Sequence, residues 1–290
     1  MKSQVIVVCS DQHCGSELGL AHPDGVTTPD GNTWKPGKAL LHLWEQYSSF
    51  VNDTERLVRG WRTTGATAHL VLLGDLTDGD HHNTHQIVGR ELGTHVGLAR
   101  KALTDGVLRI GFDSVHMVMG TPAHVGPAGG LEKSVGKNLE DAGYPIVRSP
   151  GGATIWTELL ADFGAYRFDF RHHGRASGRE HLRRSYANLY AADIYMTAVA
   201  EGRRPPDVAV RAHNHKMADS GPDHRGWTRQ ITTGCWQYSS EWVKSRSIES
   251  RPDFGGWVFY VTEHMTGPYD LQVHPLKYHH PNAEVDVWRP

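Results

Sequence analysis

Aspartate and histidine side chains, which ligate transition metals and transfer protons near neutral pH, recur at five places in this sequence. Each group follows the end of a short apolar segment. The five groups are Asp11 and His13, Asp75 and Asp78, His124, His172 and His173, and His213 and His215. In extended backbone, residues two apart point to the same side, so an Asp-x-His or His-x-His pair can converge on one point. The pattern predicts metal or proton chemistry.

The densest group lies between residues 69 and 82. An apolar run over 70–73 stops at Gly74, and five ionisable residues follow, namely Asp75, Asp78, Asp80, His81 and His82. Desolvating so many ionisable groups at the end of a buried strand is costly, and a divalent cation compensates the cost. The carboxyl edge of a sheet is also where open α/β folds bind ligands. A solvated, Asp-rich turn would explain this stretch alone, but it does not explain four further groups.

The donor types restrict the metal. Mixed imidazole and carboxylate ligands suit manganese, iron, zinc, cobalt or nickel rather than calcium, and the set is too rich in histidine for magnesium. Six or seven ligands exceed one tetrahedral site, which implies two metals roughly 3.5–4 Å apart with a carboxylate between them. We expect two divalent cations as cofactors, with manganese as the first choice and iron, zinc, nickel or cobalt as alternatives.

Apolar patterns in the first half of the chain predict the elements that position these groups. Continuous apolar runs predict buried strands, and apolar residues at steps of three and four predict amphipathic helices. The expected elements are strands at 5–8, 70–73 and 115–119, with helices over 40–61, 88–103 and 131–139 between and after them. Such alternation predicts a parallel sheet with helices on its faces.

The pattern changes in the second half of the chain. The expected elements there are strands at 153–160 and 166–171, a helix over 182–192, a strand at 208–211, and antiparallel strands in the aromatic-rich remainder, 216–290. No internal repeat or linker is visible, which favours a single domain over 1–290.

The composition is that of an ordinary globular protein, with 38% hydrophobic and 21% charged residues. A net charge of −2 gives no general attraction to polyanions, so any affinity for phosphate must be local. Three cysteines are too few for a disulfide framework, and the first apolar run is too short for a signal peptide. No run approaches the length of a membrane span. We therefore expect a cytoplasmic protein with no membrane partner.

Taken in order, five motifs resemble the signature of the calcineurin-like metallophosphoesterases. They are Asp11-Gln-His13, Gly74-Asp-Leu-Thr-Asp78, Gly120-Thr-Pro-Ala-His124, His172-His-Gly174 and Ala212-His-Asn-His215. Their order and spacing match the family from residue 11 to 215. The resemblance implies an α/β fold: a four-layer αββα sandwich of two mixed sheets flanked by helices, with the second sheet formed late in the chain.

The resemblance also implies a ligand set. It assigns Asp11, His13, Asp75 and His215 to one metal, with Asp75 bridging to the second. The second metal takes His213 and the first histidine of the fourth motif. We place that histidine at His172, because Phe170-Arg-His172 resembles the end of a strand. His173 is an alternative, since a histidine directly before glycine also occurs in the family.

The third motif departs from the family pattern. The family's asparagine, a ligand of the second metal, is Thr121 here, and the histidine lies two residues later than expected. Either His124 replaces the asparagine as a ligand, which we favour, or it keeps the family's role near the leaving group. Asn83 is another residue that can fill the gap. This variant motif and the later segment 233–237 resemble phage-encoded members of the family.

The predicted reaction is hydrolysis of phosphodiester or phosphomonoester bonds by attack of a hydroxide that bridges the two metals. His81, His82, His124 and His173 are candidates to protonate the leaving oxygen. Arginine favours bidentate contact with phosphate, which makes Arg175 and Arg179, just after the fourth motif, candidates to bind the substrate. His81 and Asn83 are further candidate substrate-binding residues.

Two other functions compete with this prediction. A DNA exonuclease or endonuclease would share the motifs and make nucleic acid the substrate, but no basic arm or aromatic-plus-lysine stripe is visible. A non-catalytic binding or assembly protein with a degenerate metal centre would explain the missing asparagine, although the rest of the ligand set argues against it. The sequence leaves the natural phosphate ester and the oligomeric state open.

Overall fold

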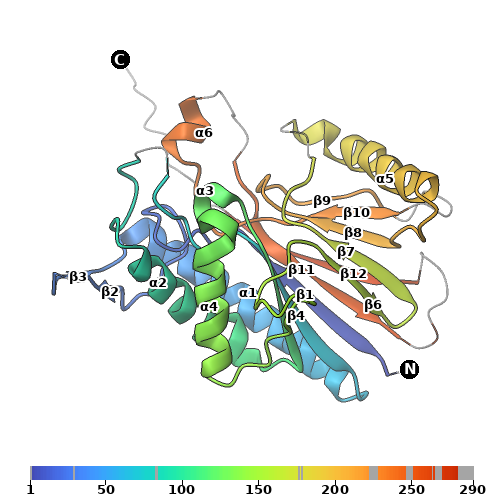
Figure 1. The fold of residues 1–290 in the computed structure, drawn as a ribbon, viewed down its shortest axis with the longest axis horizontal. Helices are drawn as coiled ribbons and strands as arrows, with labels where there is room; N and C mark the ends of the chain where they lie inside the picture. Colours follow the sequence, from blue (N-terminus) through green and yellow to red (C-terminus); the bar gives the residue numbers. More distant parts are fainter. Residues whose placement is uncertain are drawn as a thin grey trace.

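Two mixed β-sheets lie face to face between outer helices, and this confirms the predicted fold class (Figure 1). The structure is a computed structural model, and it describes residues 2–28, 30–81, 84–175, 177, 179–221, 228–245, 251–262, 264 and 270–279.

The first sheet has the strand order β12-β11-β1-β4-β5. Strands β1 (Gln4–Cys9), β4 (Thr67–Leu73) and β5 (Ser114–Val118) are parallel, whereas β11 (Phe254–Val261) and β12 (Gln272–Tyr278) extend the sheet in antiparallel fashion. The last five residues of β1 and the last four of β4 are buried, as expected for parallel strands covered on both faces.

The second sheet has the strand order β6-β7-β8-β10-β9 and comes late in the chain, as predicted. Its strands are β6 (Leu159–Phe163), β7 (Tyr166–Phe170), β8 (Val208–Arg211), β9 (Ala218–Asp219) and β10 (Arg229–Thr232). The three central strands, β7, β8 and β10, run parallel, and the edge strands β6 and β9 run antiparallel to their neighbours.

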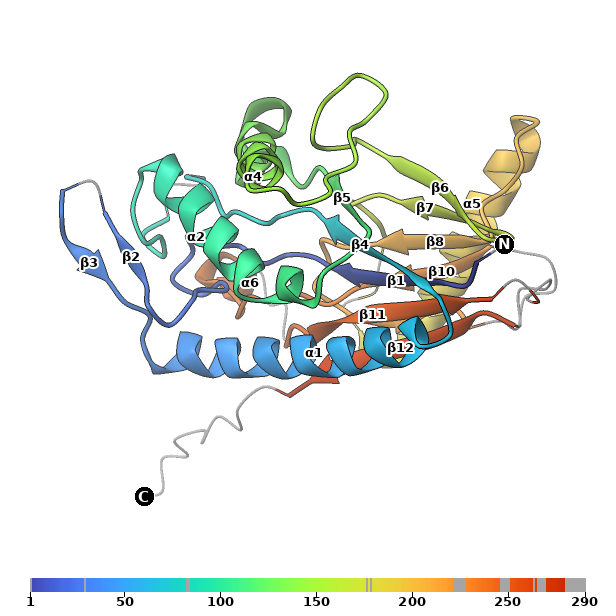
Figure 2. The same cartoon turned by 90° about the horizontal axis from the view of Figure 1, so that it is seen from below.

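Helices cover the outer faces of both sheets. The helices are α1 (Lys38–Arg62), α2 (Leu92–Thr104), α3 (Pro122–Val125), α4 (Gly130–Asp141), α5 (Arg183–Ala200) and α6 (Glu241–Ser245). Figure 2 shows α1 along the first sheet, where it contacts β11, β12, β1 and β4, and α5 lies on β9 and β10 of the second sheet. Among the described residues, no helix combines the length and apolarity needed to cross a bilayer.

The predicted strand over 153–160 is wrong for most of its length, because β6 begins only at Leu159. The preceding residues instead run beside β5. The Trp156 amide donates to the Met117 carbonyl at 2.8 Å, and the Met119 amide donates to the Trp156 carbonyl at 2.8 Å. The apolar character of this segment therefore reflects packing against the edge of the first sheet rather than membership of the second.

The antiparallel strands expected after residue 216 are also only partly correct. Strand β10 pairs with β8 in parallel, and β11 and β12 return to the first sheet, where β11 pairs with β1. Phe168 of β7 and Phe259 of β11 are both fully buried, with ring centroids 5.4 Å apart. Aromatic side chains thus fill the space between the two sheets.

Two histidines in the first sheet are linked through one hydroxyl. The Ser114 hydroxyl lies 2.7 Å from Nδ1 of His69 and 3.0 Å from Nε2 of His116. Burial lowers the pKa of His116 to about 4, and the neighbouring His69 makes a smaller contribution in the same direction. The folded protein therefore holds His116 neutral at pH values where an unfolded chain would protonate it.

This predicts a loss of stability in mild acid. The contribution of His116 is present above pH 6.5 and is lost as pH falls toward 4, because only the unfolded state binds the proton in that window. The loss amounts to about 2 kcal/mol at pH 5 and reaches about 3 kcal/mol near pH 4. Urea unfolding at pH 7.5 and pH 5 measures it, and His116→Gln should lessen the decline. If the free energy of unfolding fell equally in wild type and His116→Gln, His116 would not be the source of the pH dependence. The control is His85→Gln, because His85 is exposed.

Candidate metal centre

The carboxyl ends of five strands converge, because the loops that follow them continue to hydrogen bond to one another. The Asp11 amide donates to the Gly74 carbonyl, and the His13 amide donates to the Asp75 carbonyl, both at 2.9 Å. The His213 amide, after β8, lies 3.4 Å from Oδ2 of Asp11. These contacts bring the predicted aspartate and histidine side chains of β1, β4, β5, β7 and β8 into one cluster.

One group in this cluster consists of Asp11, His13 and His215. Oδ1 of Asp11 lies 3.3 Å from Nε2 of His215 and 3.8 Å from Nε2 of His13. Asp11 is fully buried, and its Oδ1 has no hydrogen-bond partner among the described residues. A buried carboxylate oxygen that is unpartnered and faced by ring nitrogens fits a cation-binding position.

A second group consists of Asp11, Asp75 and His172. Oδ2 of Asp75 lies 2.9 Å from Nε2 of His172, and Oδ1 of Asp11 lies 4.0 Å from the same nitrogen. The Thr121 amide and hydroxyl also donate to the two oxygens of Asp75, at 2.6 and 3.0 Å. His172 of the fourth motif is therefore buried directly against Asp75.

The outward ring nitrogens of two histidines are held by acceptors. Nδ1 of His172 lies 2.7 Å from the Leu73 carbonyl, and Nδ1 of His13 lies 2.9 Å from Oδ1 of Asp78. A carbonyl can only accept, so the proton of neutral His172 is on Nδ1 and the lone pair of Nε2 faces the cluster. Metal-ligating histidines commonly have this arrangement. The donor set therefore fits divalent cations.

The electrostatics also call for positive charge at this point. Burial opposes ionisation of Asp75, but His172 outweighs burial and holds the pKa of Asp75 well below its usual range. Burial likewise opposes protonation of His172, yet the charges of Asp75 and Asp11 raise its pKa to about 9. In the metal-free protein, a proton on His172 supplies part of the charge that a cation would supply.

Backbone strain is concentrated at the same residues. Among the described residues, six other than glycine have positive φ, and five of these belong to the cluster. They are Asp11, His13, Asp75, His213 and His215. Residues with a Cβ adopt this region at a cost of about 1–3 kcal/mol each, and such residues gather at functional sites. The left-handed backbone therefore coincides with the positions whose side chains meet in the cluster.

Two glycines allow the strand ends to approach closely. A Cβ on Gly120 would lie 2.2 Å from the Asp75 amide nitrogen, and a Cβ on Gly74 would lie 2.6 Å from Nδ1 of His172. Gly74 also has a φ of 81°, which a residue with a side chain rarely adopts. Both motif glycines are thus needed to place Asp75 beside His172.

Glu132 of α4 is a site residue that the sequence analysis missed. It is fully buried, and its two oxygens accept hydrogen bonds from the amides of Leu76 at 3.1 Å and Gly120 at 2.9 Å. Burial and the charge of Asp75 raise its pKa to about 7. Glu132 therefore ties together the loops that follow β4 and β5, directly behind Asp75. In the sequence it resembles an ordinary helix-surface charge.

Glu132→Ala should lower the free energy of unfolding by about 3 kcal/mol, because two buried amides lose their hydrogen-bond acceptor. Urea unfolding of the metal-free protein measures this. Glu140→Ala on the same helix is the matched control, since Glu140 pairs with Arg148 and Lys137 at the surface and should matter little. Equal effects of the two variants would remove the structural role given to Glu132.

Asp78, the last residue of the second motif, is the centre of a third group. Its Oδ1 lies 2.9 Å from Nδ1 of His13 and 3.5 Å from Nδ1 of His124, and its Oδ2 lies 3.4 Å from Nε2 of His81. Burial opposes ionisation of Asp78, but hydrogen bonds from His124, His13 and His81 hold its pKa well below the usual range. Asp78 was part of a motif but not of the predicted ligand set.

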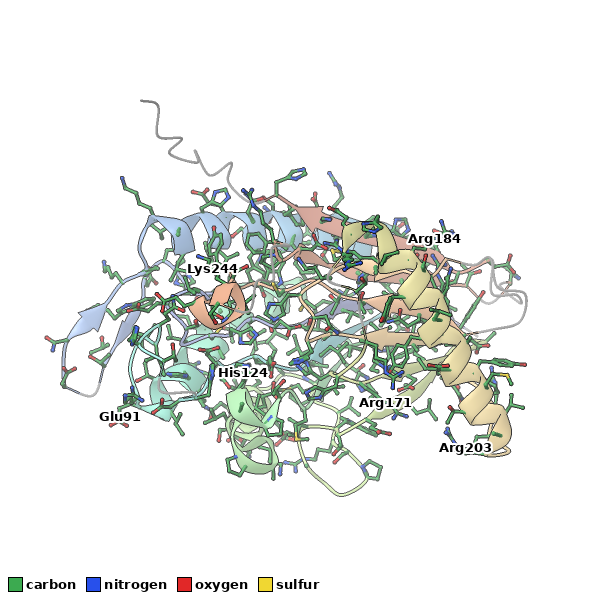
Figure 3. The ribbon with its side chains drawn as sticks, turned by 90° about the horizontal axis from the view of Figure 1, so that it is seen from above. Glu91, His124, Arg171, Arg184, Arg203 and Lys244 are labelled. Carbon is green, nitrogen blue, oxygen red and sulfur yellow. The ribbon has the colours of Figure 1, made fainter. Side chains whose placement is uncertain are left out.

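The structure places His124 with this third group rather than with His172 and His213. Short helix α3 begins at Pro122 and turns the His124 ring toward Asp78, whose carbonyl lies 3.0 Å from Nδ1. Figure 3 shows His124 on α3 and Lys244 on α6 at the same end of the molecule. The predicted role of His124 as a replacement ligand for the second metal is therefore not the one that its position favours. The other candidates, His82 and Asn83, lie outside the described residues.

The candidate phosphate-binding arginines do not reach the cluster. Arg175 is exposed, pairs with Asp193 of α5 at 3.6 Å and lies over the Tyr190 ring. Arg179 is also exposed, and neither arginine is among the described residues that line the adjoining cavity. Arg175 therefore faces Asp193 and Tyr190 of α5.

A cavity of about 580 Å³ opens beside the cluster. Its walls include His124, His81, His213 and Lys216, and Tyr238 contributes an aromatic face. Among the described lining residues, Lys216 is the one lysine or arginine. The cavity can therefore admit a molecule of the size of a nucleotide or an aryl ester, with little fixed positive charge to hold it.

No family model and no curated protein matches the sequence. A dimetal phosphatase from Danio rerio is 12% identical, with 95% of this chain and 99% of that chain covered and a TM-score of 0.42. A predicted phosphoesterase from Streptococcus pneumoniae is 13% identical over 95% of this chain and 99% of that chain, with a TM-score of 0.32. A single mutant of Vps29 from Entamoeba histolytica is 9% identical over 95% and 100%, with a TM-score of 0.35.

All three TM-scores are below 0.5, so the function is inferred from this chain's own residues. Its fold and cluster define an α/β protein with two mixed sheets and a buried set of aspartates and histidines able to hold a divalent metal.

Proposed function

We propose that this protein is a phosphoesterase that depends on two divalent cations and hydrolyses phosphodiesters. The observation that carries the proposal is the buried cluster of Asp11, Asp75, His13 and His172 beside an open cavity, with Nε2 of both histidines turned toward the carboxylates. Two bound cations would activate a water molecule for attack on phosphorus and neutralise charge on the phosphate oxygens.

The ligands divide between two positions. Asp11, His13 and His215 would hold one cation, and Asp75, His172 and His213 the other. The motifs assign the bridging role to Asp75, whereas Asp11 is the carboxylate that belongs to two of the structural groups. Oδ1 of Asp11 lies 3.3 Å from Nε2 of His215 and 4.0 Å from Nε2 of His172, so it faces both positions.

His124 is placed to protonate the leaving oxygen. Its ring lines the cavity, with Nδ1 held by the Asp78 carbonyl and carboxylate, so Nε2 remains for the substrate. Burial opposes protonation of His124, but its hydrogen bond with Asp78 outweighs burial and raises its pKa. A histidine whose pKa is raised and whose ring is fixed by a carboxylate is suited to act as a general acid.

The charge of the cavity favours a diester over a monoester. A monoester carries two negative charges, and proteins commonly hold it with arginine side chains that make bidentate contacts. The described lining residues include Lys216 but no arginine. The singly charged phosphate of a diester needs less compensation, and the cavity offers room for a second ester group.

Hydrolysis of a bis-aryl phosphate tests the proposal. Protein stripped of metal should be inactive and should regain turnover with at least one of manganese, iron, zinc, cobalt or nickel, and an aryl phosphate monoester should react more slowly. No turnover with any of these ions would overturn the enzyme proposal. Faster cleavage of labelled single- or double-stranded DNA than of the aryl diester would favour the nuclease alternative.

A further inference from the structure

We infer that His173 joins His172 and His213 to form a three-imidazole position for the second cation, so that this position selects zinc, cobalt, nickel or iron over manganese. The inference rests on the metal centre of the proposed function. It concerns the place where this chain lacks the asparagine of the third motif and has Thr121 instead. The three histidines present ring nitrogens within 4.8 Å of one another.

The Thr121 hydroxyl marks the point on which these nitrogens converge. Oγ1 lies 3.1 Å from Nδ1 of His213, 3.3 Å from Nε2 of His172 and 3.3 Å from Nε2 of His173. A hydroxyl has one proton and two lone pairs, and its proton already faces Oδ2 of Asp75 at 3.0 Å. One hydroxyl cannot satisfy three ring nitrogens and a carboxylate, whereas a cation in their midst can bind all of the lone pairs.

The backbone after β7 explains how two consecutive histidines face one point. Adjacent residues in a strand point to opposite sides, but β7 ends at Phe170 and the chain bends at His172. Gly174 then packs against Arg211 of β8 so closely that a Cβ would lie 2.5 Å from the Arg211 Cβ. This close approach brings the His173 ring centroid to 4.7 Å from that of His213 and 5.0 Å from that of His172.

The two cation positions therefore differ in chemistry. The first, with Asp11, His13 and His215, has a buried carboxylate and two imidazoles, while the second adds a third imidazole beside Asp75. Imidazole suits zinc, nickel and iron, whereas manganese prefers carboxylate and water oxygens. We accordingly expect one position to accept manganese and the other to retain a metal that prefers nitrogen.

Titration of metal-free protein with Co²⁺, followed by the visible absorption of the bound ion, tests the role of His173. Wild type should bind two ions. His173→Ala should weaken one of them at least about 10-fold and shift its absorption band, because a nitrogen ligand is lost. His173 is exposed, so folding should be preserved, and circular dichroism verifies this. The matched control is His85→Ala, because His85 is likewise exposed but belongs to none of the groups.

A competition experiment tests the selectivity. After dialysis against a large excess of Mn²⁺, wild type loaded with Zn²⁺ should retain one zinc per chain, and His173→Ala should lose most of it. Equal affinities, spectra and zinc retention in wild type and His173→Ala would overturn the inference while leaving the proposed function intact. Failure of wild type to bind any of these ions more tightly than about 1 mM would overturn both.

Discussion

Asp75→Asn should abolish phosphodiester hydrolysis, lowering kcat at least about 10³-fold, equivalent to about 4 kcal/mol in the activation barrier. The Asp75 carboxylate lies 2.9 Å from Nε2 of His172 and accepts both donors of Thr121. Replacing one oxygen by an amide removes the negative charge and turns an N–H group toward a ring nitrogen or a cation. Steady-state kinetics with a bis-aryl phosphate, together with the metal content of the variant, measures the effect.

Asp80→Asn is the matched control for this variant, because Asp80 lies five residues later and pairs with Arg90 at the surface. It should keep both the metal content and the rate of wild type. If Asp75→Asn remained folded and retained the wild-type rate, Asp75 would not be the central carboxylate and the proposed arrangement of ligands would be wrong.

His124→Gln should reduce kcat by about 10²–10⁴-fold for a diester with an alkoxide leaving group, the range that general-acid catalysis supplies. The same variant should hardly affect a substrate whose leaving group is a nitrophenolate, because that oxygen needs no proton. Rates measured across esters of increasing leaving-group pKa reveal the difference as a steeper dependence in the variant. Metal content should be unchanged, since His124 contacts Asp78 rather than His172 or His213.

Asp78→Asn provides an independent check on this role. Asp78 holds Nδ1 of His124, so its loss should give the same steeper dependence on the leaving group, together with a uniform loss of rate because His13, a proposed ligand, loses its partner. His85→Gln, on the same cavity wall, should leave the leaving-group dependence as in wild type. A uniform loss of rate across all leaving groups in His124→Gln would assign His124 to metal binding instead.

The sequence predicted the cluster because the ends of buried strands can be recognised from a few neighbouring residues. An apolar run followed by glycine and aspartate, as at residues 70–75, signals a buried strand whose loop leaves the core, and parallel strands deliver such loops to one edge. Asp11, His13, Asp75, His172, His213 and His215 could therefore be placed together without any structure. Ring orientation could not be predicted this way, and α3 turns His124 to the Asp78 side of the cluster.

Most of the features that the sequence did not predict depend on contacts between distant segments. Glu132 accepts hydrogen bonds from two backbone amides, which lie 56 and 12 residues earlier in the chain. Nothing in the local sequence of α4 distinguishes it from a solvated glutamate. Strand β11 pairs with β1 across more than 240 residues, and no local pattern specifies that choice of sheet. Arg175 looked suitable for phosphate until α5 supplied Asp193 as its partner.

The central claim is that strand-end carboxylates and imidazoles enclose two cations, and anomalous X-ray scattering from crystals of the metal-loaded protein tests it most directly. We predict two peaks about 3.5–4 Å apart, one beside Asp11, His13 and His215 and one beside Asp75, His172 and His213. An absence of peaks in this cluster, or metal bound only at distant surface histidines, would contradict the claim.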